Sequence, residues 1–354
     1  MTICLNMIVK NEIEVIGRCL ASVLSFIDYW VIVDTGSIDG TQHKIQEILK
    51  NIPGELYEKS WVNFEKNRNE ALSLAKGKAD YILFIDADET LSISEAFDKT
   101  QLHKDFYVLR LIERNTVDYF RISLIKDDPC WFWIGILHEV IDSSKSMSGT
   151  FLSSIVKNSS TFDGNRSKCI HSFLKDAAIL AEALLKEPHN SRYVFYLAQS
   201  YGRAEKYEKS LHFYKQRTSM GGDPFEIYAS FYYMGLIQQH LGKDSAEWID
   251  SYSRAYQCKP TRAEPLFQLA DYFFRSNQLL IGYFLAKAAS VLPMPSWDGH
   301  FYVSIYEYSS LLVFARCAEG LQFTQEALMA YQQLLTRKLP QDIKQFVQTA
   351  IARL

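Results

Sequence analysis

Cysteine is scarce in this 354-residue sequence, and its six cysteines are widely scattered, without a CxxC pair. This spacing excludes a zinc knuckle and gives no sign of a disulfide framework, so we expect a reducing, cytoplasmic compartment. Long apolar segments are missing as well. The longest uncharged stretch, 227–242, contains Gln238, Gln239 and His240 and falls short of a membrane span. Because the apolar run over 2–9 is also too short for a signal peptide, we expect neither a targeting nor a transmembrane segment.

A strongly basic region is absent too. The net charge is −3, and residues 1–150 hold 16 Lys and Arg against 23 Asp and Glu, whereas the remainder holds 22 against 18. This distribution does not resemble the basic surface of a nucleic-acid-binding protein, so no nucleic-acid partner is expected. An acidic domain can still bind a nucleoside diphosphate when a divalent cation lies between its carboxylates and the phosphates.

The length and a change of pattern predict two domains, 1–171 and 172–354. In the first, short runs rich in Ile and Val predict buried strands that alternate with helices. Strands are predicted over 2–9, 30–34 and 81–85 and, with some antiparallel pairing, over 106–112, 119–125 and 151–156. Helices are predicted over 12–26, 41–49 and 64–75. This alternation predicts an α/β domain with a mostly parallel, Rossmann-like sheet.

The second domain is predicted to be wholly helical from about residue 174. Leu197-Ala198, Met234-Gly235 and Leu269-Ala270 recur 37 and 35 residues apart, and the first unit has the small and large residues of a tetratricopeptide-like (TPR-like) repeat. An irregular helical bundle is the alternative. Stacked helix pairs form a concave surface that commonly holds a partner.

Two acidic motifs directly follow predicted strands, so both should lie at the carboxyl edge of the sheet, where ligands of such folds bind. Asp34 precedes Gly36, and its carboxylate could accept hydrogen bonds from a base or a ribose, although a strand–Asp–Gly turn is often structural. Asp86-Ala87-Asp88 follows the strand over 81–85. One of its carboxylates could reach a ribose while the other coordinates Mn²⁺ or Mg²⁺, cations that prefer oxygen ligands.

A third motif contains Trp131, Trp133, His138 and Glu139. Tryptophan rings can stack on a sugar, but they can equally be part of the core. His138 is a possible metal ligand and Glu139 a possible general base, with a satisfied surface pair as the alternative.

Five ordered segments resemble family 2 glycosyltransferases, which are inverting enzymes with the GT-A fold, in the subgroup that carries a helical-repeat tail. The segments are 6–12, 31–41, 64–72, 84–89 and 133–139, followed by the run 188–201 that marks the first repeat. The resemblance covers about residues 1–330. One departure is Ile38, which stands where the family more often has threonine and which removes a possible hydrogen bond near the phosphates.

The resemblance implies roles for individual residues. The base and ribose would be contacted by Lys10, Asn11, Glu12 and Asp34. Arg68 would approach the pyrophosphate, Asp86 and Ala87 the ribose side, and Asp88 would be the principal metal ligand, with Asp86 and His138 as further candidates. Glu139 would be the catalytic base, with His138 as the alternative. Trp131 and Trp133 would lie near the acceptor or sugar.

The expected activity is transfer of a sugar, with inversion, from a nucleoside-diphosphate sugar to an acceptor. A UDP-sugar is the expected donor, and a peptide, protein or glycan, held by the repeats, is the expected acceptor. Two other functions stay open. A nucleotidyltransferase would need a basic glycine-rich loop, but residues 7–12 contain no glycine. A non-catalytic repeat scaffold would not need the intact acidic residues.

Overall fold

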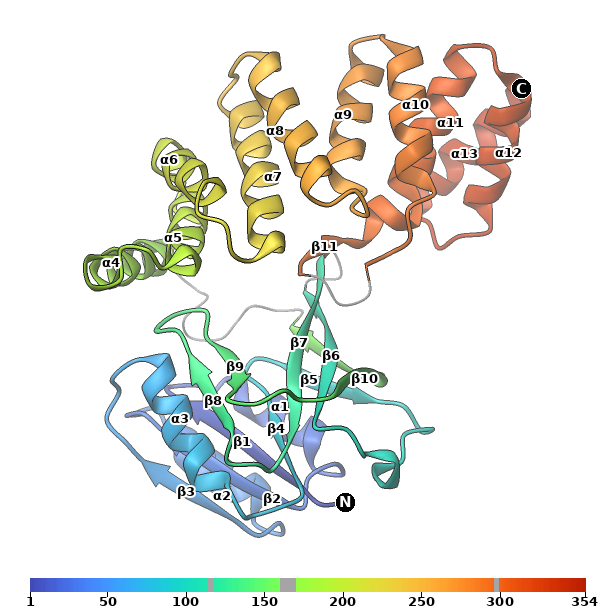
Figure 1. Ribbon diagram of the computed structural model, residues 1–354. Helices are drawn as coiled ribbons and strands as arrows, with labels where there is room; N and C mark the ends of the chain where they lie inside the picture. Colours follow the sequence, from blue (N-terminus) through green and yellow to red (C-terminus); the bar gives the residue numbers. More distant parts are fainter. Residues whose placement is uncertain (114–116, 160–169, 296–298) are drawn as a thin grey trace. The chain divides into compact units, whose positions relative to one another are not determined.

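The computed structural model describes residues 1–113, 117–159, 170–295 and 299–354. The chain divides into two compact units, Met1–Asp176 and Ala177–Leu354, called here the N-terminal unit and the helical unit (Figure 1). Helix α4 (Ile170–Lys186) contains the boundary between them.

The N-terminal unit is built on one mixed sheet. Across the sheet, the strands follow the order β3 (Gly54–Glu58), β2 (Tyr29–Asp34), β1 (Ile3–Val9), β4 (Tyr81–Phe84), β7 (Val117–Lys126), β6 (Phe106–Glu113), β10 (Gly149–Ser159) and β5 (Thr90–Ile93). The first four are mutually parallel, whereas β7 runs antiparallel to both β4 and β6. Strand β10 is parallel to β6 and antiparallel to β5. The predicted fold class, an α/β domain followed by an all-α region, is confirmed.

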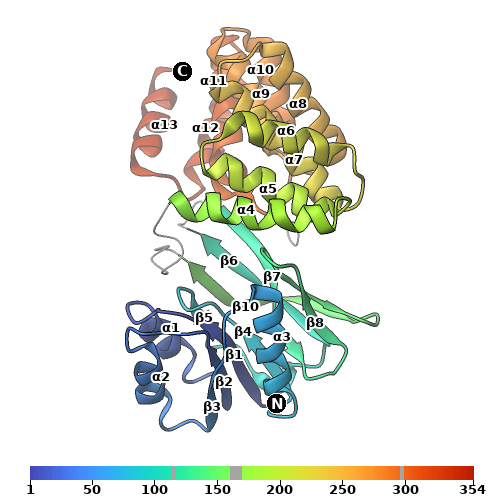
Figure 2. The same cartoon turned by 90° about the vertical axis from the view of Figure 1, so that its left-hand side faces the viewer.

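Both faces of the parallel half are covered, because successive side chains of β1 enter two different cores. Ile3, Leu5 and Met7 pack with helices α1 (Ile16–Val23) and α2 (Thr41–Leu49). Cys4 instead belongs to the core that contains α3 (Phe64–Ala75) and the hairpin of β8 (Trp131–Ile134) and β9 (Val140–Ser143). Figure 2 shows α3 on the opposite side of the sheet from α1 and α2. Such burial on both faces explains the continuous apolar runs of these strands.

The parallel register brings the functional segments to one edge of the sheet. Val9 of β1 lies beside Asp34 of β2, and Asn6 of β1 lies beside Phe84 of β4. Because β1, β2 and β4 all end at this edge, the segments that follow them meet there. These are the segments that contain Lys10–Glu12, Gly36 and the acidic motif.

The helical unit consists of antiparallel helix pairs in a TPR-like arrangement. After α4, the described helices are α5 (Ser191–Arg203), α6 (Tyr207–Thr218), α7 (Pro224–His240), α8 (Ser245–Cys258), α9 (Glu264–Arg275), α10 (Leu279–Ser290), α11 (Ser310–Gly320), α12 (Thr324–Leu335) and α13 (Gln341–Arg353). The predicted repeat positions fall in α5, α7 and α9. At Gly235, an added Cβ would lie 2.5 Å from the ring of Tyr252 on α8, so only glycine allows this close helix contact.

The prediction that this region is wholly helical is wrong at one place. Strand β11 (Phe301–Tyr302) and the π-helical turn η3 (Ile305–Ser309) follow α10. The reason is local, because Pro293 and Pro295 cannot continue a helix. Within the described parts of the chain, no helix is both long and apolar enough to cross a membrane.

Candidate functional site

Asp34 ends β2, and one of its two carboxylate oxygens has no hydrogen-bond partner among the described residues. The residue is 0 % exposed, and its Oδ1 accepts hydrogen bonds from the backbone N–H of Gly36 at 2.8 Å and of Ser37 at 2.7 Å. Gly36 supports this turn with a φ of 104°. Oδ2 is buried and has no hydrogen-bond partner among the described residues. A buried acceptor without a partner calls for an explanation, and a hydroxyl or N–H of a bound ligand would supply one.

The segment after β1 is fastened to the segment after β2. Asn11, with φ 54°, donates its backbone N–H to Ser37 Oγ at 2.8 Å and accepts one from Ile38 N–H at 2.9 Å through its side-chain oxygen. The backbone N–H of Glu12 donates to Thr41 Oγ1 at 2.8 Å. Asn11 therefore positions the loop around Asp34. Ile38 takes part through its backbone, and its side chain is 93 % exposed.

The acidic motif forms a turn that is held by basic side chains from three elements. Its backbone is closed by a hydrogen bond from Glu89 N–H to Asp86 O at 3.0 Å. The two carboxylate oxygens of Asp86 accept from Arg68 of α3 at 2.7 Å and from Arg121 of β7 at 3.1 Å. Glu89 accepts from Arg121 at 2.7 Å and from Lys157 of β10 at 2.9 Å.

Arg68 connects this turn to the proposed base. Its Nε lies 2.5 Å from Glu139 Oε1, and its guanidinium stands 4.9 Å from the ring centre of Trp133. Burial alone would lower the pKa of Arg68, but Glu139 and Asp86 raise it well above its usual value. Arg68 is therefore charged, and it already binds two of the carboxylates that were predicted to act in the site.

The two aspartates of the motif are in opposite electrostatic states. Desolvation raises the pKa of Asp86, but Arg121, Arg68 and Lys157 together lower it well below its usual range. Desolvation, followed by the charges of Asp86 and Glu89, raises the pKa of Asp88 to about 6. Unlike Asp86, Asp88 forms no ion pair within the described part of the chain. Arg68, Arg121 and Lys157 form ion pairs with Asp86, Glu89 and Glu139, and none of these pairs includes Asp88.

The β8–β9 turn carries His138 and Glu139 on a strained backbone. His138 has φ 53° and Gly135 has φ 103°. Helix α3 holds this hairpin, because the side chain of Asn69 donates to Trp133 O and accepts from Trp133 N–H, both at 2.8 Å. The same helix therefore positions Arg68 and, through the hairpin, Glu139.

Trp131 and Trp133 lie in the core. They are 3 % and 5 % exposed, and each packs edge-on against an aromatic ring, Trp131 on Phe106 at 6.0 Å and Trp133 on Phe84 at 5.0 Å. This placement does not support the expected stacking on a sugar. The alternative interpretation, that these rings complete the core, fits the structure.

Three residues of the site have no role in the sequence interpretation: Glu89, Arg121 and Lys157. A signal for Lys157 was present, because Ile155, Lys157 and Ser159 occupy the buried positions of β10 at a spacing of two. A lysine at an inward position of a strand predicts a buried acidic partner. The partner itself, Glu89, lies 68 residues earlier.

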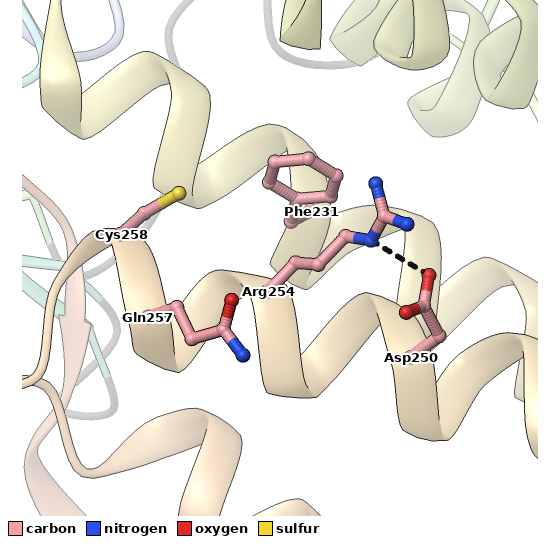
Figure 3. Close-up of a pocket in the computed structure, with 5 residues that line it drawn as sticks. All are labelled: Phe231, Asp250, Arg254, Gln257 and Cys258. Atoms are coloured by element: carbon pink, nitrogen blue, oxygen red, sulfur yellow. Dashed lines mark ion pairs between the residues drawn. The ribbon is translucent and has the colours of Figure 1, made fainter.

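A hollow in the helical unit lies between α7 and α8, where Phe231 borders Asp250, Arg254, Gln257 and Cys258 (Figure 3). Arg254 pairs with Asp250 of its own helix at 2.8 Å, and both side chains are more than half exposed. Water screens such a pair, so the hollow offers little to recognise a ligand.

Residues 4–100 match the sequence model of Glycosyl transferase family 2. The fold and this match define the N-terminal unit as a glycosyltransferase domain, joined to TPR-like repeats. The N-terminal unit therefore contains a glycosyl transferase family 2 domain over residues 4–100.

The names of two relatives correspond to these two kinds of domain. A TPR repeat-containing protein of Synechococcus elongatus is 36 % identical over 151 residues, which are 40 % of this chain and 36 % of the relative. An uncharacterized glycosyltransferase of Rickettsia prowazekii is 35 % identical over 85 residues, 24 % of this chain and 27 % of its own length. The chain thus spans about a third of the length of the curated relatives it matches.

Among solved structures, the C-terminal part of a TPR repeat-containing protein from Cytophaga hutchinsonii is similar to 46 % of this chain, with 59 % of its own length covered, 14 % identity and a TM-score of 0.38.

Proposed function

We propose that this protein transfers a sugar, with inversion, from a nucleoside-diphosphate sugar to an acceptor, with a UDP-sugar as the expected donor. The observation that supports this most is the half-satisfied buried carboxylate of Asp34. Asp34 lies at the edge of the sheet where β2 and β4 end, and the acidic turn follows β4 at the same edge. Both lie within the residues that match the glycosyltransferase family. The free Oδ2 would accept a hydrogen bond from the base or ribose, beside Lys10, Asn11 and Glu12.

The carboxylates of the 86–89 turn are oxygen ligands of the kind that a divalent cation prefers. In the described residues, no cluster of three or more His, Cys, Asp or Glu side chains is arranged to hold a metal alone. Mg²⁺ and similar ions are, however, commonly held by one or two carboxylates together with substrate phosphates. Asp88 would be that carboxylate, because Asp86 is already bound by two arginines; Asp86 and His138 are further candidates. When bound, Mn²⁺ or Mg²⁺ would neutralise charge that develops on the leaving diphosphate.

Arg68 and Glu139 would act on the diphosphate and the acceptor. The diphosphate would take over contacts of Arg68 and so release Glu139, whose carboxylate would accept the proton of the acceptor hydroxyl. The acceptor oxygen bonds to the anomeric carbon as the bond to the β-phosphate oxygen breaks, and the electron pair of that bond leaves with the nucleoside diphosphate. General-base help of this kind is typically worth about 10²–10⁴-fold in rate. His138 is the alternative base.

For the acceptor, we propose a peptide or protein segment, with a glycan as the alternative. Helices α5 and α7 form a second hollow in the helical unit, lined by aromatic residues that include Phe195, Tyr196 and Tyr233 and by Arg192. His300 also borders it, and desolvation together with Arg203 and Arg262 lowers the pKa of His300 to about 4. Its neutral ring can both donate and accept hydrogen bonds at pH 7, as peptide recognition requires.

The test is a screen of nucleotide sugars for turnover with Mn²⁺ and with EDTA, using the wild type and Asp88→Asn. We expect release of a nucleoside diphosphate that requires Mn²⁺ and is lost in the variant. Pyrophosphate release from a nucleoside triphosphate would instead identify a nucleotidyltransferase. A folded wild type that neither binds nor turns over any nucleotide sugar would identify a scaffold, and activity retained in EDTA would contradict the metal requirement.

A further inference from the structure

Glu89 is the most buried acidic residue of the turn. The proposed contacts to the sugar donor and the cation do not include its side chain. Glu89 is 3 % exposed, and its carboxylate accepts three hydrogen bonds. The donors are Arg121, Lys157 and the backbone N–H of Asp86, the last at 3.0 Å to Oε2. Because Asp86 O in turn accepts from Glu89 N–H, residues 86 and 89 are tied together twice. The turn that carries Asp88 is therefore closed by the side chain of Glu89.

Lys157 is the buried counter-charge that keeps Glu89 in this position. Its side chain is 0 % exposed, and it lies in β10 beside Leu91 of β5 and Leu111 of β6. Desolvation, and after it the positive charge of Arg121, lowers the pKa of Lys157. The ammonium group is therefore unfavourable at this buried position unless a carboxylate pairs with it, and Glu89 does so at 2.9 Å. A buried lysine between three strands of the sheet is a fixed anchor, because neighbouring strands leave it little freedom to move.

We propose that Glu89, held by Lys157 and Arg121, is the positioning residue that fixes the 86–89 turn in the shape that receives the diphosphate and its cation. This rests on the proposed function. Glu89 touches neither ligand and acts through the backbone of Asp86 and the placement of Asp88. Residues that orient the direct ligands of a metal typically change metal affinity about 10–100-fold when they are mutated.

The experiment uses the full chain and two readouts. Amide hydrogen exchange of the ligand-free protein reports on the N–H groups of Asp86 and Glu89. Titration with Mn²⁺ in the presence of UDP, followed by electron paramagnetic resonance, reports on the cation site without turnover. The main variant combines Glu89→Leu with Lys157→Met, because it removes the acceptor of Asp86 N–H and loss of both charges leaves neither partner of this ion pair buried alone. Glu89→Asp is the second variant; it keeps the charge but is one methylene too short to reach Asp86 N–H.

We expect both variants to exchange the two turn amides at least about tenfold faster, with the amides of β1 and β2 unchanged. Mn²⁺ affinity in the presence of UDP should fall about 10–100-fold. In turnover, the KM for the sugar donor should rise while kcat at saturating metal and donor stays close to that of the wild type. Lys157→Arg should largely retain the wild-type affinity, because it keeps the charge.

The matched control removes a buried ion pair of the helical unit, Arg262 with Glu264, by Arg262→Met with Glu264→Gln. Its side chains are 2 % and 1 % exposed, comparable to the Lys157 pair. Stability should change without an effect on Mn²⁺ affinity. Folded variants of Glu89 with wild-type Mn²⁺ affinity, or with unchanged exchange at the turn, would overturn the proposal. Failure of the proposed function is distinguishable, because the wild type itself would then bind no Mn²⁺ with UDP.

Discussion

Asp88 lies beside two other carboxylates, Asp86 and Glu89, in a turn where burial removes much of the screening water. Its pKa of about 6 compares with an ordinary value of 3.8. Between these pH values the folded protein binds more protons at this residue than the unfolded chain, so the free energy of unfolding falls as pH rises from about 4 to about 6. Above about pH 6, where Asp88 is ionised in the folded protein as well, the free energy of unfolding no longer falls on account of this residue. The ionised Asp88 thus destabilises the ligand-free fold at neutral pH.

We therefore expect Asp88→Asn to stabilise the ligand-free protein at pH 7 by about 1–3 kcal/mol, because each pKa unit corresponds to about 1.4 kcal/mol. Thermal unfolding should show this as an increase of several degrees in the first transition, and the difference from the wild type should shrink towards zero below pH 4. The same variant should lose Mn²⁺-dependent turnover. A variant less stable than the wild type at pH 7 would contradict this electrostatic description.

Glu139 and His138 can be separated by kinetics. If Glu139 is the base, Glu139→Gln should lower kcat at least about a hundredfold with little change in affinity for the sugar donor. His138→Ala should weaken metal or donor binding if His138 is a ligand. Normal turnover by Glu139→Gln, together with an inactive His138→Ala at saturating metal and donor, would assign the base role to His138.

Among the elements, helix α3 has the largest part in positioning the site. Arg68 binds Asp86 and Glu139, and the next residue, Asn69, makes the two hydrogen bonds that hold β8. The same end of the helix is tied to the preceding loop by Asn67, which accepts from Val62 N–H at 2.9 Å and donates to Ser60 O at 3.0 Å. A helix fixed at these points can hold a buried guanidinium between two carboxylates.

Asn69→Ala should destabilise the N-terminal unit by about 1–3 kcal/mol, because two hydrogen bonds are lost and the buried backbone groups of Trp133 are left unpaired. We also expect a higher KM for the sugar donor and a lower kcat, since Arg68 and Glu139 lose their mutual alignment. Thermal unfolding and steady-state kinetics check both. Lys66→Ala, at an exposed position of the same helix, is the control, and an equal effect of the two variants would argue against a specific role of Asn69.

The sequence predicted the elements whose residues are buried on a regular spacing. The helices predicted over 41–49 and 64–75 coincide with α2 and α3, and the strands over 2–9, 30–34 and 81–85 correspond to β1, β2 and β4 within a residue or two. Strand β3 was missed because its sequence, GELYE, lies at the sheet edge and is only half buried. The helix over 12–26 is shorter in the structure, because residues 11–13 bond to the segment after β2 instead.

For the site, the sequence indicated which acidic residues gather at the sheet edge, because strand ends in a parallel sheet meet there. It could not show that Arg68 lies between Asp86 and Glu139, since that contact joins residues 71 positions apart. Charge pairing of this kind depends on side-chain reach across three elements. Nor does local sequence distinguish a tryptophan on an open surface from one in the core, as at Trp131 and Trp133.

Each of the two units has hydrophobic cores of its own. Two buried clusters draw their residues from the N-terminal unit, and two others, centred on Tyr252 and Tyr331, draw theirs from the helical unit. The helical unit also contains its own buried ion pairs, Arg217 with Glu226 and Arg262 with Glu264. A unit with a separate core and internally compensated charges has what independent folding requires.

We therefore predict that a fragment beginning near Ser172 and ending at Leu354 folds by itself into a helical protein. Only the first two residues of α4 are lost, and they precede the unit boundary at Ala177. Circular dichroism should show a predominantly helical spectrum with a cooperative thermal transition, because the stacked pairs bury their apolar faces on one another. The two residues of β11 are too few to add a visible β signal. A fragment that is unfolded alone and gains structure only when residues 1–171 are added would show that the repeats depend on the glycosyltransferase domain.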